Sequence, residues 1–133
     1  MTITAEFGLS AIGQIAINAH DIDRAVEFYR DKLGMKFLFS APPGLAFFDC
    51  AGIRLMLSPP AKPEFDHPGS IIYFNVDDIQ SAFTTLSERG VTFEEPPAFV
   101  ANMGTYDLWI GAFRDSEGNL LAIMSNVPHD GGA

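Results

Sequence analysis

Hydrophobic and polar positions alternate in short runs along the chain, and an apolar stripe with helical spacing follows two of these runs. Residues 15–18 alternate as in a strand with one buried face. Asp21 is then placed to cap a helix with its carboxylate, and Gly34 is placed to end that helix. Further strands are predicted at 35–39, 45–48 and 53–57. The first half is therefore predicted to run strand, helix, strand, strand, strand.

The second half follows the same order. A helix is predicted at 78–89 and a turn at 115–118. The sequence that ends in Glu95, Pro96 and Pro97 is interpreted as a strand that leaves for a loop. Strands are predicted at 70–76, 91–94, 108–113 and 119–125.

Two sequence blocks recur in the same order. The segment that starts at Ile15 matches the segment that starts at Ile72, so that Asp21 corresponds to Asp78, 57 positions later. A second block, starting at Ala46, matches residues from Ala112 onward, 66 positions later. Two matches in one order indicate that the chain holds two copies of one module.

The repeated order predicts an α+β fold of two β-α-β-β-β modules whose curved sheets enclose a cleft. The 133 residues are one ordinary domain by length. The domain 1–133 is expected to comprise module one at about 10–58, a proline-rich connector at about 59–69, module two at about 70–126 and a flexible tail at 127–133.

Charge and composition exclude several classes of function. Lys and Arg number 8 against 17 Asp and Glu, which gives a net charge of −9. This acidic balance disfavours nucleic acid and an anionic membrane surface as partners. The single cysteine, Cys50, excludes an internal disulfide framework and a cysteine-rich zinc site. No signal peptide or membrane span is recognised, so a cytoplasmic protein is expected.

The helix and turn segments carry a family likeness. The helix preceded by His20 and ending at Gly34, the start of the second helix at Val76, and the hairpin from Phe113 to Asn119 resemble the vicinal oxygen chelate superfamily. That superfamily includes glyoxalase I, extradiol dioxygenases and bleomycin-resistance proteins. The resemblance covers about residues 10 to 126 and implies the two-module fold already expected.

In the enzymes of that superfamily a divalent metal is held by His, Glu or Gln from the first and last strands of each module, and it polarises a substrate through two neighbouring oxygens. The resemblance carries these positions to Gln14, Met56, Ile71 and Ala122. Ile and Ala have no donor atom, and the methionine thioether is a soft ligand unsuited to an oxygen-chelating site. We therefore expect no metal and no cofactor, and the chemistry of a glyoxalase, epimerase or dioxygenase is disfavoured.

Strand alternation predicts which side chains share the cleft with these positions. The predicted lining is mostly apolar with a few polar groups, as is usual for small-molecule sites. The candidate ligand-binding residues are Gln14, Arg54, Met56, Tyr73, Asn75, Trp109, Leu120 and Ala122. Each has an alternative role: Arg54 as an exposed strand residue, Met56 as core filler, and Trp109 as packing at a dimer interface. His67, in the connector, is interpreted either as a structural residue or as a group at the mouth of the pocket.

Three functions follow, from different classes. The leading one is a metal-free protein that resembles bleomycin-resistance proteins and sequesters an apolar or aromatic ligand, for which the acidic charge permits a cation. The alternative is a glyoxalase-like lyase or a dioxygenase with non-standard metal ligands. The third is a structural or regulatory partner domain, which predicts a filled interior. A homodimer is expected because exposed strand edges tend to be covered.

Overall fold

The computed structural model describes residues 7–42 and 44–128, which form two four-stranded mixed sheets. The first sheet holds β1 (Gln14–Asn18), β2 (Lys36–Ala41), β3 (Leu45–Cys50) and β4 (Ile53–Ser58). The second holds β5 (Ile72–Asn75), β6 (Phe93–Asn102), β7 (Tyr106–Arg114) and β8 (Leu120–Pro128). The strand orders, β1-β4-β3-β2 and β5-β8-β7-β6, are the same pattern twice. The predicted α+β fold of two modules is confirmed.

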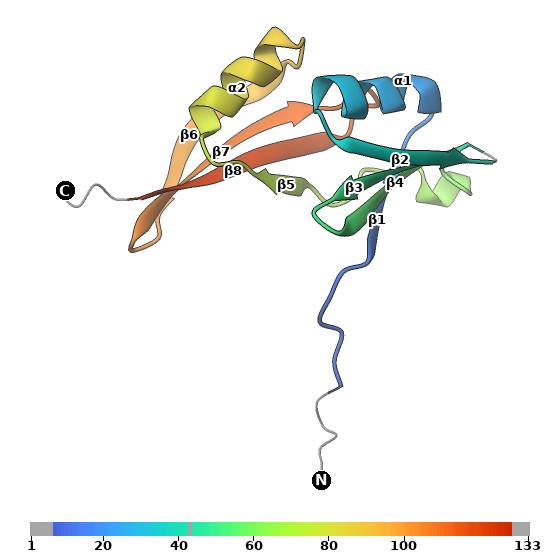
Figure 1. Ribbon diagram of the computed structural model, residues 1–133, viewed down its shortest axis with the longest axis horizontal. Helices are drawn as coiled ribbons and strands as arrows, with labels where there is room; N and C mark the ends of the chain where they lie inside the picture. The colour runs from blue at the N-terminus through green and yellow to red at the C-terminus, as the bar shows by residue number, and fades with distance from the viewer. Residues whose placement is uncertain (1–6, 43, 129–133) are drawn as a thin grey trace.

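One helix follows the first strand of each module. The helices are α1 (Ile22–Glu27), which continues into the π-helical turn η2 (Phe28–Lys32), and α2 (Ile79–Glu88). Both lie on the same side of the sheets, whereas the N-terminal segment extends away on the opposite side (Figure 1). The connector holds only a short 3-10 turn, η3 (Pro63–Phe65).

Aspartate caps the start of both helices, as predicted for the first. Asp21 Oδ1 accepts the backbone N–H of Arg24 at 3.1 Å, and Asp78 Oδ1 accepts that of Ser81 at 3.1 Å. The carboxylates satisfy N–H groups that have no partner within the helix. The first helix does not stay α-helical to Gly34, because its last turn widens into η2.

The strand register bears out the repeat. In the first module β1 and β4 pair in parallel, with Ala16 opposite Met56. In the second, β5 and β8 pair in parallel, with Tyr73 opposite Ala122. These are corresponding residues under the sequence repeat, so each module aligns its first and last strands in the same way.

A single hydrophobic cluster lies between the sheets and the helices and joins both modules. From the first module it includes Tyr29 of η2, with Phe48 and Leu57 of the first sheet. Phe113 and Leu121 extend it into the second sheet. Residues on the helix-facing side of both sheets thus form the core, and the opposite side of the sheets is left for other contacts.

Three strands of the second sheet run further than predicted: β6 and β8 at their C-terminal ends, and β7 at both ends. β6 continues through Pro96 and Pro97 instead of leaving for a loop. This correction has a structural reason: β6 is the outer strand of its sheet and carries several register shifts, where a residue without an N–H is tolerated. A Cβ on the neighbouring Gly111 would lie 3.2 Å from the nitrogen of Pro97, so the close approach of the two strands favours glycine there.

The predicted tail begins inside a strand. β8 runs to Pro128, so Val127 and Pro128 belong to the second sheet, and the rest of that predicted tail lies outside the described residues. Among the described residues, no helix has the length and apolar character needed to cross a membrane.

Candidate functional site

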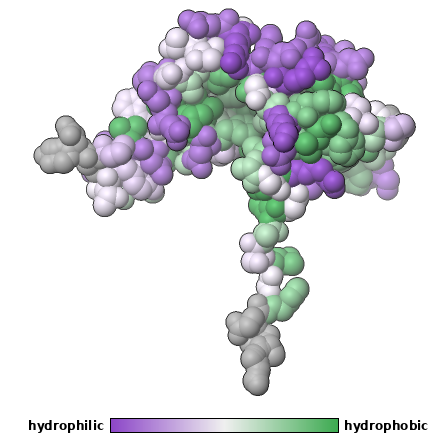
Figure 2. All heavy atoms as spheres, viewed as in Figure 1, coloured by the Kyte–Doolittle hydropathy of each residue, from purple (hydrophilic) through white to green (hydrophobic). Residues whose placement is uncertain are grey.

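A cleft of about 1130 Å³ lies where the two modules meet. Its walls are β1, the connector from Phe65 to Ser70, the first residues of β5 and β8, and the turn between β7 and β8. Ligand sites usually have volumes of about 300–1,000 Å³, so the cleft is large enough for a small molecule. Hydrophobic surface is visible in the hollow between the modules (Figure 2).

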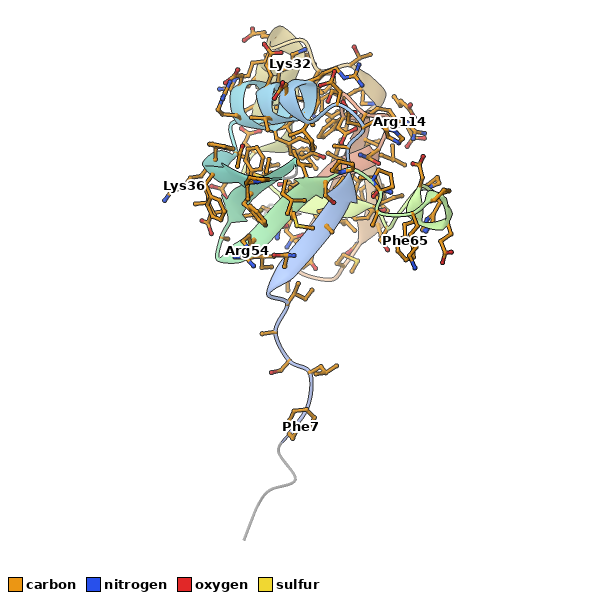
Figure 3. All side chains as sticks on the ribbon, turned by 90° about the vertical axis from the view of Figure 1, so that its right-hand side faces the viewer. Phe7, Lys32, Lys36, Arg54, Phe65 and Arg114 are labelled. Carbon is orange, nitrogen blue, oxygen red and sulfur yellow. The ribbon has the colours of Figure 1, made fainter. Side chains whose placement is uncertain are left out.

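The connector is fixed along one wall of the cleft by two polar contacts. The amide Nδ2 of Asn18, at the end of β1, donates to the carbonyl of Phe65 at 2.8 Å. His20 Nε2 lies 2.9 Å from Asp66 Oδ1. Phe65 and Arg114 lie on the same side of the molecule (Figure 3), and both line the cleft. His67 lines it as well, with Nδ1 3.0 Å from the carbonyl of Pro68.

The turn between β7 and β8 closes the cleft through a buried aspartate. Asp115 is 6% exposed, and its Oδ2 accepts the hydroxyl of Tyr29 at 2.7 Å. Its Oδ1 accepts the backbone N–H groups of Glu117 and Asn119, each at 2.8 Å. Burial of the phenol, together with the charge of Asp115, raises the pKa of Tyr29. Tyr29 therefore stays a neutral donor and ties the second module to the helix of the first.

Glu117 completes this junction. Its side chain is 2% exposed and accepts Arg24 Nε at 2.8 Å and Nη2 at 3.1 Å. It also accepts the backbone N–H groups of His20 and Asp21, at 3.1 and 3.0 Å. The hydrogen bonds from Arg24 lead the causes that lower the pKa of Glu117 to about 2. The carboxylate is thus ionised at neutral pH, and its oxygens are occupied by protein donors.

Three of the predicted site residues contact one another on the first sheet, on the face away from α1. Arg54 Nε donates to Gln14 Oε1 at 2.8 Å, and Gln14 Nε2 lies 3.8 Å from the sulfur of Met56. The Arg54 guanidinium lies 5.1 Å from the ring centroid of Phe47. Gln14 lines the cleft, whereas Arg54 and Met56 lie outside it. The Phe47 ring also packs against Phe39, with ring centroids 4.8 Å apart.

The predicted residues of the second sheet are dispersed. Leu120 lines the cleft, together with Ile71. Tyr73 is opposite Ala122, and Asn75 is the next residue of β5 on that face, all outside the cleft lining. Tyr73 is 47% exposed, whereas Ala122 is only 1% exposed. These two neighbours therefore differ in whether a ligand could reach them.

Trp109 requires a correction. It pairs with Ser125 and shares the helix-facing side of β7 with Phe113, a core residue. Trp109 packs against this core and contacts Phe99 with ring centroids 6.5 Å apart. Alternation places Ile110 and Ala112 on the other face, so the tryptophan does not share the face of Ala122.

The four positions that correspond to the metal ligands of the related enzymes do not form a metal site. The Gln14 amide oxygen accepts from Arg54, and its partner Met56 offers only a thioether. Ile71 and Ala122 have no donor atom. Within residues 7–42 and 44–128, no group of three or more His, Cys, Asp or Glu side chains is placed to hold an ion. The side chains present do not fit a divalent metal.

Several cleft residues were missed by sequence reasoning. His20, Asp66, Arg114, Glu117 and Asn119 all line the cleft. The hairpin that holds the last three was recognised as a turn, and its Asp-x-x-Gly-Asn spacing is the signal that marked it. The contacts that bring these residues to the cleft join positions far apart in the chain, which no local pattern reveals.

Comparison with known proteins agrees with this architecture. Residues 11–123 match the Glyoxalase/Bleomycin resistance protein/Dioxygenase superfamily. The uncharacterized protein YurT of Bacillus subtilis (strain 168) is 33% identical over 126 residues, which cover 82% of this chain and 94% of YurT.

Solved structures show the same fold. A lactoylglutathione lyase from Agrobacterium tumefaciens superposes with a TM-score of 0.72 at 24% identity, covering 89% of this chain and 95% of the lyase chain. A superfamily member from Sphaerobacter thermophilus gives 0.74 at 25% identity, covering 88% and 98%. Because the family match spans most of its length and the fold agrees, the chain belongs to the glyoxalase/bleomycin resistance protein/dioxygenase superfamily.

Proposed function

We propose that this protein binds an apolar or aromatic small molecule in the cleft between its modules, without a metal ion, and sequesters it. The observation that carries the proposal is the set of side chains at the family's metal positions, Gln14, Met56, Ile71 and Ala122. Two of the four have no donor atom, and a catalytic metal needs about three protein ligands. The fold of the family is retained, and the cleft between the modules is large enough for a ligand.

The polar groups of the cleft support a ligand of low charge. Glu117 is paired with Arg24, and Asp66 with His20. Arg114 donates to Glu94 at 2.7 Å. The charged side chains at the rim therefore have protein partners, and apolar contact with residues such as Ile71 and Leu120 is left to hold the ligand. The net charge of −9 favours a cation over an anion of similar shape and disfavours nucleic acid.

We further propose a cytoplasmic homodimer. Phe7 and Leu9, on the segment before β1, are 87% and 96% exposed, and Phe7 lies far from the body of the molecule (Figure 3). Ile71 is exposed at the mouth of the cleft. Exposed apolar side chains of this kind usually mark a contact with a partner protein, and we propose that this partner is a second copy of the chain. The free thiol of Cys50 fits a reducing compartment.

The test is a thermal-shift screen of aromatic compounds, cationic and neutral, followed by titration of the hits. Ile71→Trp should fill the mouth of the cleft and lower affinity at least tenfold. Val100→Trp, at an equally exposed position of β6 outside the cleft, is the matched control and should bind like the native protein. A stabilisation that follows ligand concentration is expected for a true ligand. No shift across the panel would overturn the proposal.

The second candidate is a lyase or dioxygenase with ligands from other positions. His20, Asp66 and His67 line the cleft and carry nitrogen and oxygen donors, although these described side chains are not placed to hold an ion together, and the fold is shared with a lactoylglutathione lyase. Elemental analysis of protein purified without chelators separates the two candidates. Stoichiometric zinc, nickel, iron or manganese would favour the enzyme and refute metal-free binding.

A further inference from the structure

A second, smaller hollow lies on the helix side of the sheets, away from the cleft. It has a volume of about 480 Å³ and is bounded by α2 and by the end of the first helix. None of its lining residues lines the cleft. We name it the interhelical groove and define it by Leu33, Met35, Phe74, Val76, Ala82 and Leu86, which form its apolar walls.

Both modules build the interhelical groove. Leu33 and Met35 come from the end of the first module's helix, and Phe74 and Val76 from β5 and the residue after it. Phe113 and Ile123 of the second sheet also line it. Its walls are therefore mostly aliphatic and aromatic, which suits a hydrocarbon chain.

The two ends of the groove carry opposite charges. Asp77 and Asp78 line it at the start of α2, and Arg89 lines it at the helix end. α2 has ten residues, so these ends are separated by about 15 Å at 1.5 Å per residue. A linear molecule that lies along the groove would meet an acidic end and a basic end.

At the basic end Lys32, which does not itself line the groove, lies beside Arg89 and Gly90. Arg89 Nη1 donates to the backbone carbonyl of Lys32 at 3.2 Å. The Lys32 ammonium lies 3.3 Å from where a Cβ on Gly90 would be, and Lys32 is at the top of the molecule in Figure 3. In the described part of the chain neither cation has an ion pair, whereas Arg24, Arg30 and Arg114 each have one.

Arg89 and Lys32 thus carry positive charge at this end of the groove without a paired carboxylate in the described residues, and the Lys32 ammonium lies 5.7 Å from the ring centroid of Phe28. Neighbouring like charges repel, and a negative group placed between them would remove the repulsion. A guanidinium binds a carboxylate in a planar, two-point geometry. Arg89 donates one hydrogen bond to the Lys32 carbonyl, and its guanidinium has further N–H donors for such a group.

We propose that the interhelical groove binds a linear aliphatic monocarboxylate of medium chain length. The carboxylate contacts Arg89 and Lys32, and the alkyl chain lies against Leu33, Phe74 and Val76. Asp77 and Asp78 at the far end repel a second carboxylate, so a dicarboxylate of the same length binds more weakly. This site is independent of the ligand proposed for the cleft.

The experiment is calorimetric titration of the full chain with decanoate below its micelle concentration. Arg89→Gln keeps a donor for the Lys32 carbonyl but removes the charge, and it should weaken binding about tenfold or more. Arg30→Gln, in η2 at the end of the first helix and outside the groove, is the control and should leave binding unchanged. Decanedioate, decanol and decylammonium should each bind less tightly than decanoate.

Two blocking variants separate this site from the cleft. Ala82→Trp should abolish decanoate binding, whereas Ile71→Trp should preserve it. Loss of decanoate binding in Ile71→Trp would place the fatty acid in the cleft and overturn the inference. Equal affinity for decylammonium, or for the Arg89→Gln variant, would show that the cations do not select the ligand and would overturn it as well. Absence of any binding by native protein refutes it directly.

Discussion

The two modules share a turn but use it differently. In the second module, Asp115 is buried and bonds to Tyr29 of the first module's helix, to Asn119 and to the backbone of its own turn. In the first module, the corresponding Asp49 is half-buried, and within residues 7–42 and 44–128 its side chain accepts only the backbone N–H of Gly52, at 3.2 Å. One turn is a junction between modules, and the other only closes a hairpin.

The two helices differ at the position of Tyr29, whose hydroxyl reaches Asp115. Tyr29 corresponds in the repeat to Leu86, which has no hydroxyl to donate. Leu86 instead lines the interhelical groove and belongs to the hydrophobic cluster. The two modules therefore share the same backbone arrangement. Only the first has a tyrosine at this helix position, and its hydroxyl forms the buried hydrogen bond to Asp115 that joins the modules.

The largest expected loss of stability comes from removing Asp115, and removal of the corresponding Asp49 is the comparison. Asp115→Ala leaves the Tyr29 hydroxyl and two backbone N–H groups without their acceptor, and it should lower the free energy of unfolding by about 3–5 kcal/mol. Asp49→Ala should cost less than about 1 kcal/mol. Urea unfolding at pH 7 measures both. Similar losses for the two variants would contradict the comparison.

Glu117 should give the next largest effect and a pH signature. Its pKa is lowered from an ordinary value of 4.5 to about 2, so its stabilisation is complete above about pH 5 and is lost as the pH falls toward 2. Because Arg24 is half-exposed, we expect Glu117→Gln to cost only about 2 kcal/mol at pH 7. Unfolding at several pH values tests this. Between pH 5 and 2, the free energy of unfolding should change less with pH in the variant than in the native protein. An equal change in the two proteins would refute the stabilising role of the Glu117 carboxylate.

Tyr29→Phe should cost less than the loss of Asp115 or of Glu117. It removes one hydrogen bond to Asp115 but keeps the ring that packs 5.9 Å from Phe48. Asn119 still donates to the carboxylate at 2.9 Å, so the expected loss is about 1–2 kcal/mol. A double variant with Asp115→Ala should cost less than the sum of the single losses, because both remove the same bond. Additive losses would mean that the contact carries no energy.

The fold was predictable because its signals are local and occur twice. Alternation located β1 and β4, Asp21 marked the helix start, and the repeat supplied the second module. Trp109 was misplaced because membership of β7 does not reveal which face a residue takes until the strand's register is known. The site was largely missed for a different reason: the pairing of His20 with Asp66 joins β1's end to the connector through a tertiary contact.

The prolines of β6 limit how the protein can associate. Pro96 and Pro97 lie on the outermost strand of the second sheet and have no N–H to offer a neighbouring chain. Along this stretch the sheet edge cannot template another strand, which protects a long exposed edge against fibril-like growth. The same two residues that obscured the strand in the sequence thus guard the protein against aggregation.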